Sequence, residues 1–186
     1  IDVLLLQEVG SGSHDGAAFA AALSTRLGYH FAYAPAQPLG KSGSQGLAIV
    51  SRHPLSDIRS HPLTYYRLRF RSRCRVGLAA TLDTNYGPVR IMNVHLDTRI
   101  NSRDRLAQLE PLVTALSATG GPQVIGGDFN TMNIRWFRTM WPVPLGERQT
   151  TAVRTRLAEH GFQTPSASGP PTIKFFGLPI RLRWIY

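Results

Sequence analysis

The fold of this chain is decided in the stretch VIGGDFNT, from Val124 to Thr131. Apolar residues run into a pair of glycines, and the acid Asp128 and the amide Asn130 follow almost at once. Gly, Asp and Asn are ordinary turn residues, so a plain turn is one interpretation. The other is a buried strand whose carboxyl end carries catalytic side chains. The rest of the chain must separate the two.

Two further apolar stretches end in a polar residue of a catalytic type. VLLLQE ends at Glu8, and IMNVH ends at His95. In open α/β sheets, functional sites gather at the carboxyl ends of strands. We therefore expect Glu8, His95, Asp128 and Asn130 to lie at one rim of the core.

These residue types suit a hard cation and a phosphate group. Mg²⁺ prefers oxygen ligands and keeps several waters, so one or two carboxylates are enough to hold it, and Glu8 is the predicted ligand. Phosphodiester hydrolysis also needs a positioned water and donors to the phosphoryl oxygens. Asp128 is expected to orient the water or accept its proton. His95 and Asn130 are expected to donate to phosphoryl oxygens, and a protonated His95 would also counter their charge.

The hydrophobic pattern predicts more strands than helices, with hairpins and crossovers mixed. Asp15 is the predicted N-cap of the first helix, in which Phe19, Leu23 and Leu27 recur at spacing four. This pattern favours a two-sheet core flanked by helices. The predicted helices span 13–29, 101–117 and 150–162; the strands span 3–9, 29–34, 46–51, 55–63, 76–83, 89–97, 122–130 and 178–186; and residues 35–45 and 162–172 are predicted loops.

The length of 186 residues suits a single domain over 1–186, and 42% hydrophobic residues are enough for a sizeable core. Cys74 is the only cysteine, which excludes a disulfide within the chain and a cysteine-based zinc site. It is expected to be buried or half-buried. No stretch approaches the length of a transmembrane helix. The chain opens and closes in apolar runs, whereas natural termini are usually polar, so we expect it to be an internal piece of a longer polypeptide.

The net charge of +10 favours an anionic partner, either nucleic acid, phosphorylated lipid or a membrane surface. An arginine-rich proteome is the alternative explanation. The segment YYRLRFRSRCR (65–75) is interpreted either as a nucleic-acid platform or as a solvated strand with its arginines outward and Leu68 and Phe70 inward. Asp97 is open in the same way, as a support for the site or as a solvated loop acid.

Five motifs occur in the order found in the endonuclease/exonuclease/phosphatase superfamily, which the chain therefore resembles: LLLQEV, GLAIVSRHPL, NVHLDT followed by RLAQL, IGGDFNT and RLRWIY. That group includes pancreatic deoxyribonuclease and abasic-site endonucleases. The resemblance implies a four-layer αββα sandwich, with two mixed β-sheets flanked by helices, and phosphoester hydrolysis that depends on Mg²⁺ or Mn²⁺.

The resemblance also assigns roles by position. Glu8 matches the metal-binding Glu of the family, and His95 matches the His that contacts the scissile phosphate. Asp128 and Asn130 match the pair that orients the nucleophile and binds phosphate. Arg75 stands where members often place an arginine near the substrate.

The chain departs from the family pattern in three places. The family's strand that bears a catalytic Asn and its final Ser-Asp-His motif are not in this sequence, so the resemblance implies that the domain lacks its first and last strands here. Arg183 stands at the position of the Asp in the family's Arg-Leu-Asp-Trp-Ile motif. The favoured function is a nuclease-like phosphodiesterase acting on DNA or RNA. A lipid phosphodiesterase or phosphoinositide phosphatase is the alternative among enzymes. A catalytically impaired member that binds nucleic acid or anionic lipid is the alternative outside them.

Overall fold

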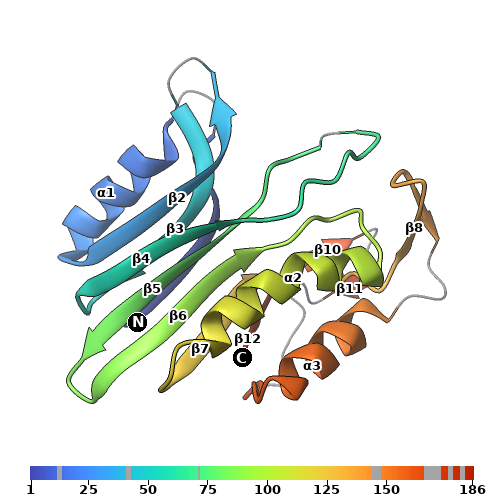
Figure 1. The fold of residues 1–186 in the computed structure, drawn as a ribbon. Helices are drawn as coiled ribbons and strands as arrows, with labels where there is room; N and C mark the ends of the chain where they lie inside the picture. The colour runs from blue at the N-terminus through green and yellow to red at the C-terminus, as the bar shows by residue number, and fades with distance from the viewer. Residues whose placement is uncertain are drawn as a thin grey trace.

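Two β-sheets pack face to face at the centre of the computed structural model (Figure 1). The structure describes residues 1–11, 14–40, 43–70, 72–143, 148–165, 173–175, 178–180 and 183–186. One sheet has the strand order β1-β3-β2 and the other has the order β12-β7-β6-β5-β4. A shared apolar core joins the two sheets, with Leu47 and Ile49 from the first and Leu78 and Ile91 from the second.

The strands of the two large sheets are β1 (Val3–Val9), β2 (His30–Leu39), β3 (Gly43–Ser51), β4 (Leu55–Pro62), β5 (Val76–Thr84), β6 (Gly87–His95), β7 (Gln123–Asp128) and β12 (Arg183–Ile185). Two short hairpins are formed by β8 (Arg135–Phe137) with β9 (Trp141–Val143) and by β10 (Ile173–Phe175) with β11 (Leu178–Ile180). The predicted strand at 178–186 therefore corresponds to β11 and β12, with residues 181 and 182 outside the described part. Most of the predicted loop at 162–172 also lies outside it.

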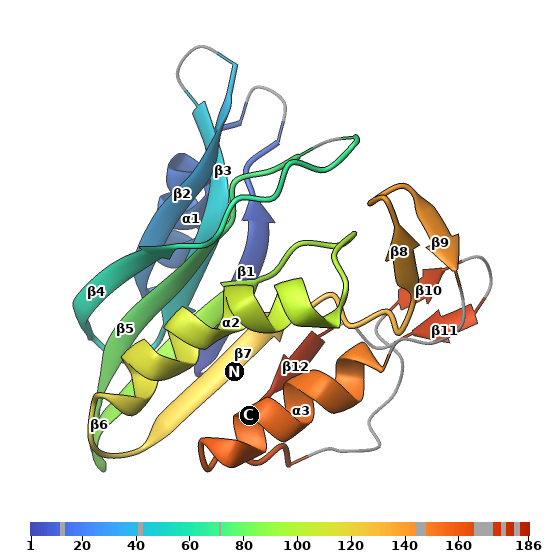
Figure 2. The same ribbon diagram turned by 45° about the vertical axis from the view of Figure 1, so that its right-hand side comes forward.

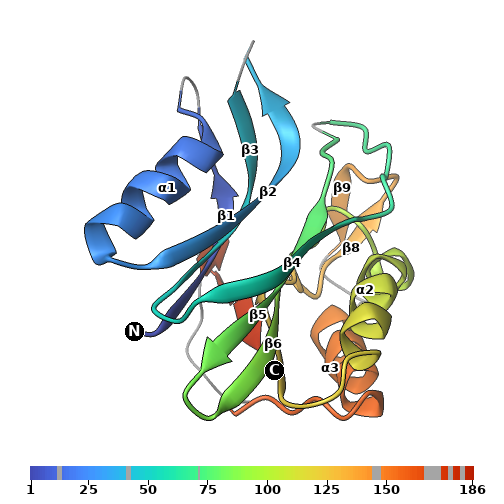
Figure 3. The same cartoon turned by 60° about the vertical axis from the view of Figure 1, so that its left-hand side comes forward.

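Helices cover the outer faces of the sandwich. The helix α1 (Gly16–Leu27) lies on the three-stranded sheet, whereas α2 (Ser102–Ser117) and α3 (Gln149–Glu159) lie on the five-stranded sheet (Figures 1 and 3). The predicted four-layer arrangement is confirmed. Strands β6 and β7 are parallel because α2 crosses between them, so the five-stranded sheet is mixed. The strand pairs of the three-stranded sheet are antiparallel.

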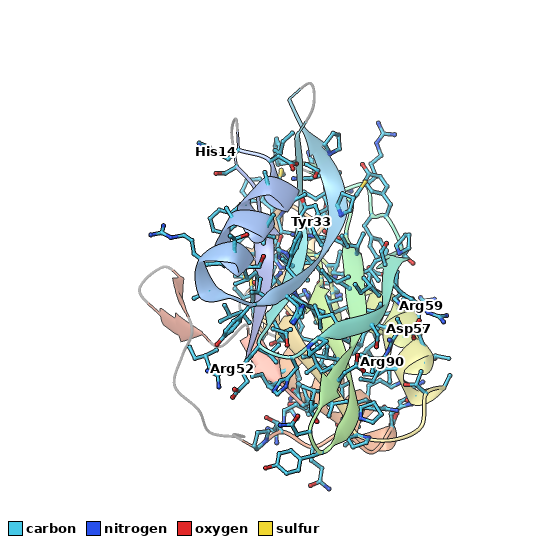
Figure 4. The ribbon with its side chains drawn as sticks, turned by 90° about the vertical axis from the view of Figure 1, so that its left-hand side faces the viewer. His14, Tyr33, Arg52, Asp57, Arg59 and Arg90 are labelled. Atoms are coloured by element: carbon cyan, nitrogen blue, oxygen red, sulfur yellow. The ribbon has the colours of Figure 1, made fainter. Side chains whose placement is uncertain are left out.

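The helix α1 begins at the predicted cap, where Asp15 Oδ2 accepts from the Ala18 N–H at 3.1 Å. The apolar side chains that predicted this helix are not its buried ones, since Phe19 is 53% exposed and Leu27 is 44% exposed. Its inner face carries Gly16, Ala20 and Ser24 instead. A side chain at Gly16 would collide with the ring of Tyr33, which Figure 4 labels beside α1. The helix thus packs closely through small residues.

Two segments differ from their predictions. The region 35–45 belongs mainly to the β2–β3 hairpin, because β2 is an edge strand and tolerates Pro35 and Pro38. The segment 65–75 forms no strand in its described residues. The predicted alternation holds for Leu68, which is buried between the exposed Arg67 and Arg69, but it fails at Phe70, which is exposed, and at Arg75, which is buried. Cys74 is exposed, which corrects the expectation of burial.

Asn93, in the middle of β6, is fully buried and joins the two sheets. Its Nδ2 donates to the carbonyl oxygens of Leu6 in β1 at 2.9 Å and of Ala48 in β3 at 3.0 Å. Its Oδ1 accepts from Gln7 Nε2 at 2.8 Å. One amide of the five-stranded sheet therefore bonds to both neighbouring strands of the other sheet, and its burial is compensated.

Gly127 lets β7 approach this amide. Its φ is +133°, and a side chain there would collide with the backbone of Val94 and meet Asn93 Oδ1 at 3.0 Å. Glycine alone adopts such a backbone readily. One of the two glycines in VIGGDFNT is thus required by the close packing of β6 and β7.

We predict that Asn93→Ala lowers the free energy of unfolding by about 2–4 kcal/mol, because three buried hydrogen bonds are lost together. The matched control is Asn85→Ala, in the exposed turn between β5 and β6, which is expected to change it by less than about 0.5 kcal/mol. Urea unfolding at constant m-value measures both. Equal effects of the two substitutions would contradict the role of Asn93.

Candidate active site

Three strand ends bring the predicted site residues together. His95 and Asp128 end the parallel strands β6 and β7 and are partners in the β-ladder. Glu8 lies near the end of β1 in the other sheet. Arg75 connects them, since its Nη1 lies 2.9 Å from His95 Nδ1 and 3.8 Å from Glu8 Oε1. The predicted rim therefore exists, at the seam between the two sheets.

A bulge in β1 aims Glu8. The pairing of β1 with β3 shifts between Leu6 and Val9, and Glu8 has a positive φ of 54°. Bulges redirect side chains and recur near active sites. The preceding residue fixes the bulge, because Gln7 Nε2 donates both to Leu5 O and to Asn93 Oδ1. The Gln-Glu pair of the sequence thus works as one unit, in which Gln7 holds the backbone and Glu8 faces solvent.

The hydrogen bond from Arg75 defines the state of His95. A guanidinium group can only donate, so Nδ1 of the imidazole must accept and carries no proton. The neutral ring then bears its proton on Nε2, which lies 4.0 Å from Asp128 Oδ2. An imidazolium has no lone pair to accept the hydrogen bond from Arg75, so this contact disfavours the protonated His95 that the sequence analysis considered. The ring is set to donate from Nε2.

Arg75 is 8% exposed and lies in a buried ion pair. Its Nε donates to Asp97 Oδ1 at 3.3 Å, and Gln108 Nε2 donates to Asp97 Oδ2 at 2.9 Å. Burial lowers the pKa of the Arg75 guanidinium, while Asp97 and Glu8 oppose that shift. Asp97 is 1% exposed, so its interpretation as a solvated loop acid is wrong. It holds Arg75, and Arg75 holds His95.

A second buried cation supports the loops after β6 and β7. Arg105 is fully buried, and its Nη1 donates to Asp97 O and Phe129 O, each at 2.7 Å. Its Nη2 donates to Ile100 O at 3.1 Å. The sequence pattern did not single out Arg105, because an arginine in a helix rich in charged residues resembles a surface cation. Its position eight residues after Asp97 also gives no sign that the two residues are in contact.

The Asp128–Asn130 segment is both a strand end and a turn. The Asn130 N–H donates to Asp128 Oδ1 at 2.9 Å, and Asn130 has a left-handed φ of 51°. Its Nδ2 donates to Leu96 O at 2.7 Å. Asn130 therefore braces the two strand ends, and Asp128 is held with Oδ2 on the side of His95. VIGGDFNT is therefore a turn at the end of a buried strand.

Arg73 also contacts the candidate site, although the sequence pattern did not single it out within the segment 65–75. Its Nη1 donates to Glu8 Oε1 at 2.7 Å and to Gln45 Oε1 at 3.2 Å. Among the described residues no group of three or more His, Cys, Asp or Glu side chains could hold a metal ion. A single accessible carboxylate fits a Mg²⁺ that keeps most of its waters, and does not fit a closed zinc site. Arg73 occupies that carboxylate here.

Two hollows of the surface differ in whether the predicted site residues line them. One of about 530 Å³ lies against α3 and is lined by Arg154, Phe162 and Tyr186, among others, but by none of the predicted site residues. A much smaller hollow of about 10 Å³ is lined by Glu8 and His95, together with Arg75. The site is thus a shallow rim and not a deep pocket.

With this geometry established, comparison with known proteins defines the family. A model of the Endonuclease/Exonuclease/phosphatase family matches residues 1–180. The chain belongs to this family. Three of the motifs that carried the resemblance, LLLQEV, NVHLDT and IGGDFNT, lie at the strand ends described above. A search of curated proteins found no match.

Solved structures of the family share the fold. An endonuclease/exonuclease/phosphatase protein from Beutenbergia cavernae DSM 12333 is 22% identical, with a TM-score of 0.73, over 99% of this chain and 54% of its own. NExo from Neisseria, a 3′ phosphatase bound to a product DNA hairpin, is 20% identical, with a TM-score of 0.64, over 99% of this chain and 75% of its own.

ANGEL2, a 2′,3′-cyclic phosphatase, is 27% identical with a TM-score of 0.56. The similarity covers 70% of this chain and 40% of ANGEL2. The chain therefore spans about half the length of the B. cavernae protein and less of ANGEL2. Below 25% identity such similarity establishes the fold alone.

We predict that Asp97→Ala lowers the free energy of unfolding by about 3–5 kcal/mol, because it leaves the buried Arg75 cation without its carboxylate. The control is Asp2→Ala, which breaks the exposed Asp2–Arg52 pair of 3.0 Å and is expected to cost less than about 1 kcal/mol. Urea unfolding compares the two. A small effect of Asp97→Ala would show that Arg75 does not depend on it.

Proposed function

We propose that the protein is a metal-dependent phosphodiesterase of the nuclease type. The observation that carries the proposal is the convergence of Glu8, His95 and Asp128 from three strand ends of the two sheets, linked by Arg75. Family membership supports phosphoester hydrolysis, and the carboxylates of Glu8 and Asp128 near the imidazole of His95 support the roles proposed below.

Each side chain has a proposed role in the reaction. His95 Nε2–H donates to a non-bridging phosphoryl oxygen. Asp128 Oδ2 orients the attacking water and accepts its proton while the bond from phosphorus to the leaving oxygen breaks. Their separation of 4.0 Å is too long for a direct hydrogen bond and is compatible with a water or phosphoryl oxygen between them. The second amide hydrogen of Asn130 is the proposed donor to another oxygen.

In this scheme Arg75 positions the imidazole of His95, because its guanidinium donates to Nδ1, the ring nitrogen that does not face Asp128. The sequence analysis assigned it to substrate binding. Its contacts with His95 and Asp97 favour action through the imidazole, with a long-range attraction for the phosphate added. Arg73 is nearer to solvent and is the better candidate for direct contact with a phosphate.

Glu8 is the proposed ligand of Mg²⁺ or Mn²⁺. When bound, such an ion polarises the phosphoryl group and stabilises charge on the leaving oxygen. Arg73 would have to release Glu8 or share it, and its long side chain would then be free to pair with the phosphate.

Nucleic acid is the favoured substrate class. The NExo protein is bound to a product DNA hairpin, ANGEL2 is a 2′,3′-cyclic phosphatase, and the net charge of +10 suits a polyanion. None of the structures compared above is described with a lipid, so a lipid substrate has no comparable support. The described helices include none that is long and apolar enough to cross a membrane.

A catalytically impaired, nucleic-acid-binding member is the second candidate. Arg73 neutralises Glu8, and Arg183 stands where the family pattern has an acid. The backbone of Arg183 pairs with Asp128, while its side chain lies outside the described part of the structure. Tight binding of nucleic acid without turnover would support this candidate, and robust turnover would exclude it.

We predict that Asp128→Asn lowers the turnover of bis(p-nitrophenyl) phosphate and of plasmid DNA by about 10²–10⁴-fold, because the proton acceptor is lost. The matched control is Asp83→Asn, an exposed residue in β5, which should leave turnover unchanged. The assay uses the full-length protein with Mg²⁺ and with a chelator. Unchanged turnover by Asp128→Asn, or turnover that survives the chelator, would refute the proposal.

A further inference from the structure

Exposed aromatic rings gather on two segments that lie side by side beyond the site. Tyr65 and Phe70 come from the loop between β4 and β5, and Phe137 and Trp141 come from the β8–β9 hairpin. Figures 2 and 3 show this loop next to the hairpin. The segments are tied together, since the Arg69 N–H donates to Thr139 Oγ1 at 3.0 Å. We call these four rings, with the neighbouring arginines 67, 69, 135 and 138, the aromatic–arginine surface.

The hairpin is built with one inner and one outer face. Trp136 is 8% exposed and packs on Met132 and Ile134. Asn101 fixes it from both sides, because Asn101 Oδ1 accepts from the Trp136 N–H at 2.7 Å and Nδ2 donates to Trp136 O at 3.1 Å. The inner face therefore secures the hairpin to the start of α2.

The outer face presents rings to solvent. Phe137 and Trp141 are partners across the hairpin, so their side chains lie on the same side of it. Trp141 is 60% exposed and Phe70 is 57% exposed, so neither ring belongs to the core. Exposed large rings grouped in this way mark a binding surface.

The turn of the hairpin is strained. Arg138 and Thr139 both have positive φ angles, of 49° and 56°. Glycine or asparagine usually takes such positions, and a β-branched residue such as Thr is unfavourable there. Strain kept at a surface turn is a feature of functional sites. Here it places Arg138 at the tip and Thr139 against the 65–70 segment.

Charge defines the partner. No acidic residue occurs between Asp57 and Asp83, or between Asp128 and Glu147. Among the described residues, no carboxylate lies within 4.0 Å of the guanidinium groups of Arg67, Arg69, Arg135 and Arg138. Some arginines elsewhere are paired, as Arg59 and Arg90 are with Asp57 (Figure 4). The surface therefore offers unneutralised cations beside exposed rings.

We propose that the aromatic–arginine surface binds a single-stranded nucleic acid and leads it to the site, a proposal that rests on the proposed function. Unpaired bases stack on aromatic rings, and arginines contact the phosphates between them. In a duplex the base faces are covered, so the rings would gain nothing. The 65–70 segment continues to Arg73 and Arg75, which contact Glu8 and His95, so a strand on this surface reaches the reacting groups.

The test measures binding to the full-length protein in chelator, so that no cleavage interferes. The probes are labelled oligothymidylate and oligouridylate of about 12 nucleotides, a blunt DNA duplex and anionic phosphatidylserine vesicles. Trp141→Ala and Phe70→Ala are each expected to weaken oligonucleotide binding about tenfold, and Trp141→Phe to restore most of it, because one base stack is lost or kept. The control is Tyr86→Ala, a fully exposed ring at the opposite end of β6, which should leave binding unchanged.

The proposal is overturned if both alanine variants bind like the wild type, if the duplex binds as tightly as the single strands, or if only vesicles bind. Binding that depends on Trp141, in a protein without turnover, would refute the proposed function and keep this surface. Turnover by a protein whose oligonucleotide binding is unchanged by Trp141→Ala would support the proposed function and refute the role of this surface. The two proposals therefore fail separately.

Discussion

The amide of Asn93 is the contact on which the rest of the site depends. Two sheets that met only through apolar side chains could slide, whereas three hydrogen bonds from one buried amide fix β6 against β1 and β3. The same amide holds Gln7 and so sets the bulge that turns Glu8 to the rim. Gly127 leaves it the space it needs. The packing of the two sheets and the geometry of the candidate site therefore rest on the same interaction.

From that seam a chain of polar contacts runs outward. Asp97 holds Arg75, Arg75 sets the tautomer of His95, and the paired strand ends place His95 opposite Asp128. A buried cation is costly unless it is paired, so Asp97 stabilises the fold as well as positioning Arg75. Glu8 alone stays accessible, with Arg73 on its carboxylate. The buried groups of the candidate site are thus held by hydrogen bonds, whereas the Arg73–Glu8 ion pair is partly exposed to solvent.

Local patterns predicted the strands that carry Glu8, His95 and Asp128, and the helix at 101–117, because apolar periodicity reports burial directly. They failed where tertiary contacts decide. Arg75 is buried by Asp97, which lies 22 residues away in the sequence, and Arg105 by backbone carbonyls of two loops. The roles of the site residues came from their resemblance to a family. No periodicity could have shown that Gly16, and not Phe19, faces the sheet.

The central claim is that Glu8, His95 and Asp128 form one phosphate-handling site across the two sheets. A crystal structure of the full-length protein with Mn²⁺ and inorganic phosphate tests it most directly, because anomalous scattering locates the metal. The predicted result is Mn²⁺ on the Glu8 carboxylate, Arg73 displaced from it, and a phosphate oxygen hydrogen-bonded to His95 Nε2. An intact Arg73–Glu8 pair without metal, or phosphate bound away from His95 and Asp128, would contradict it.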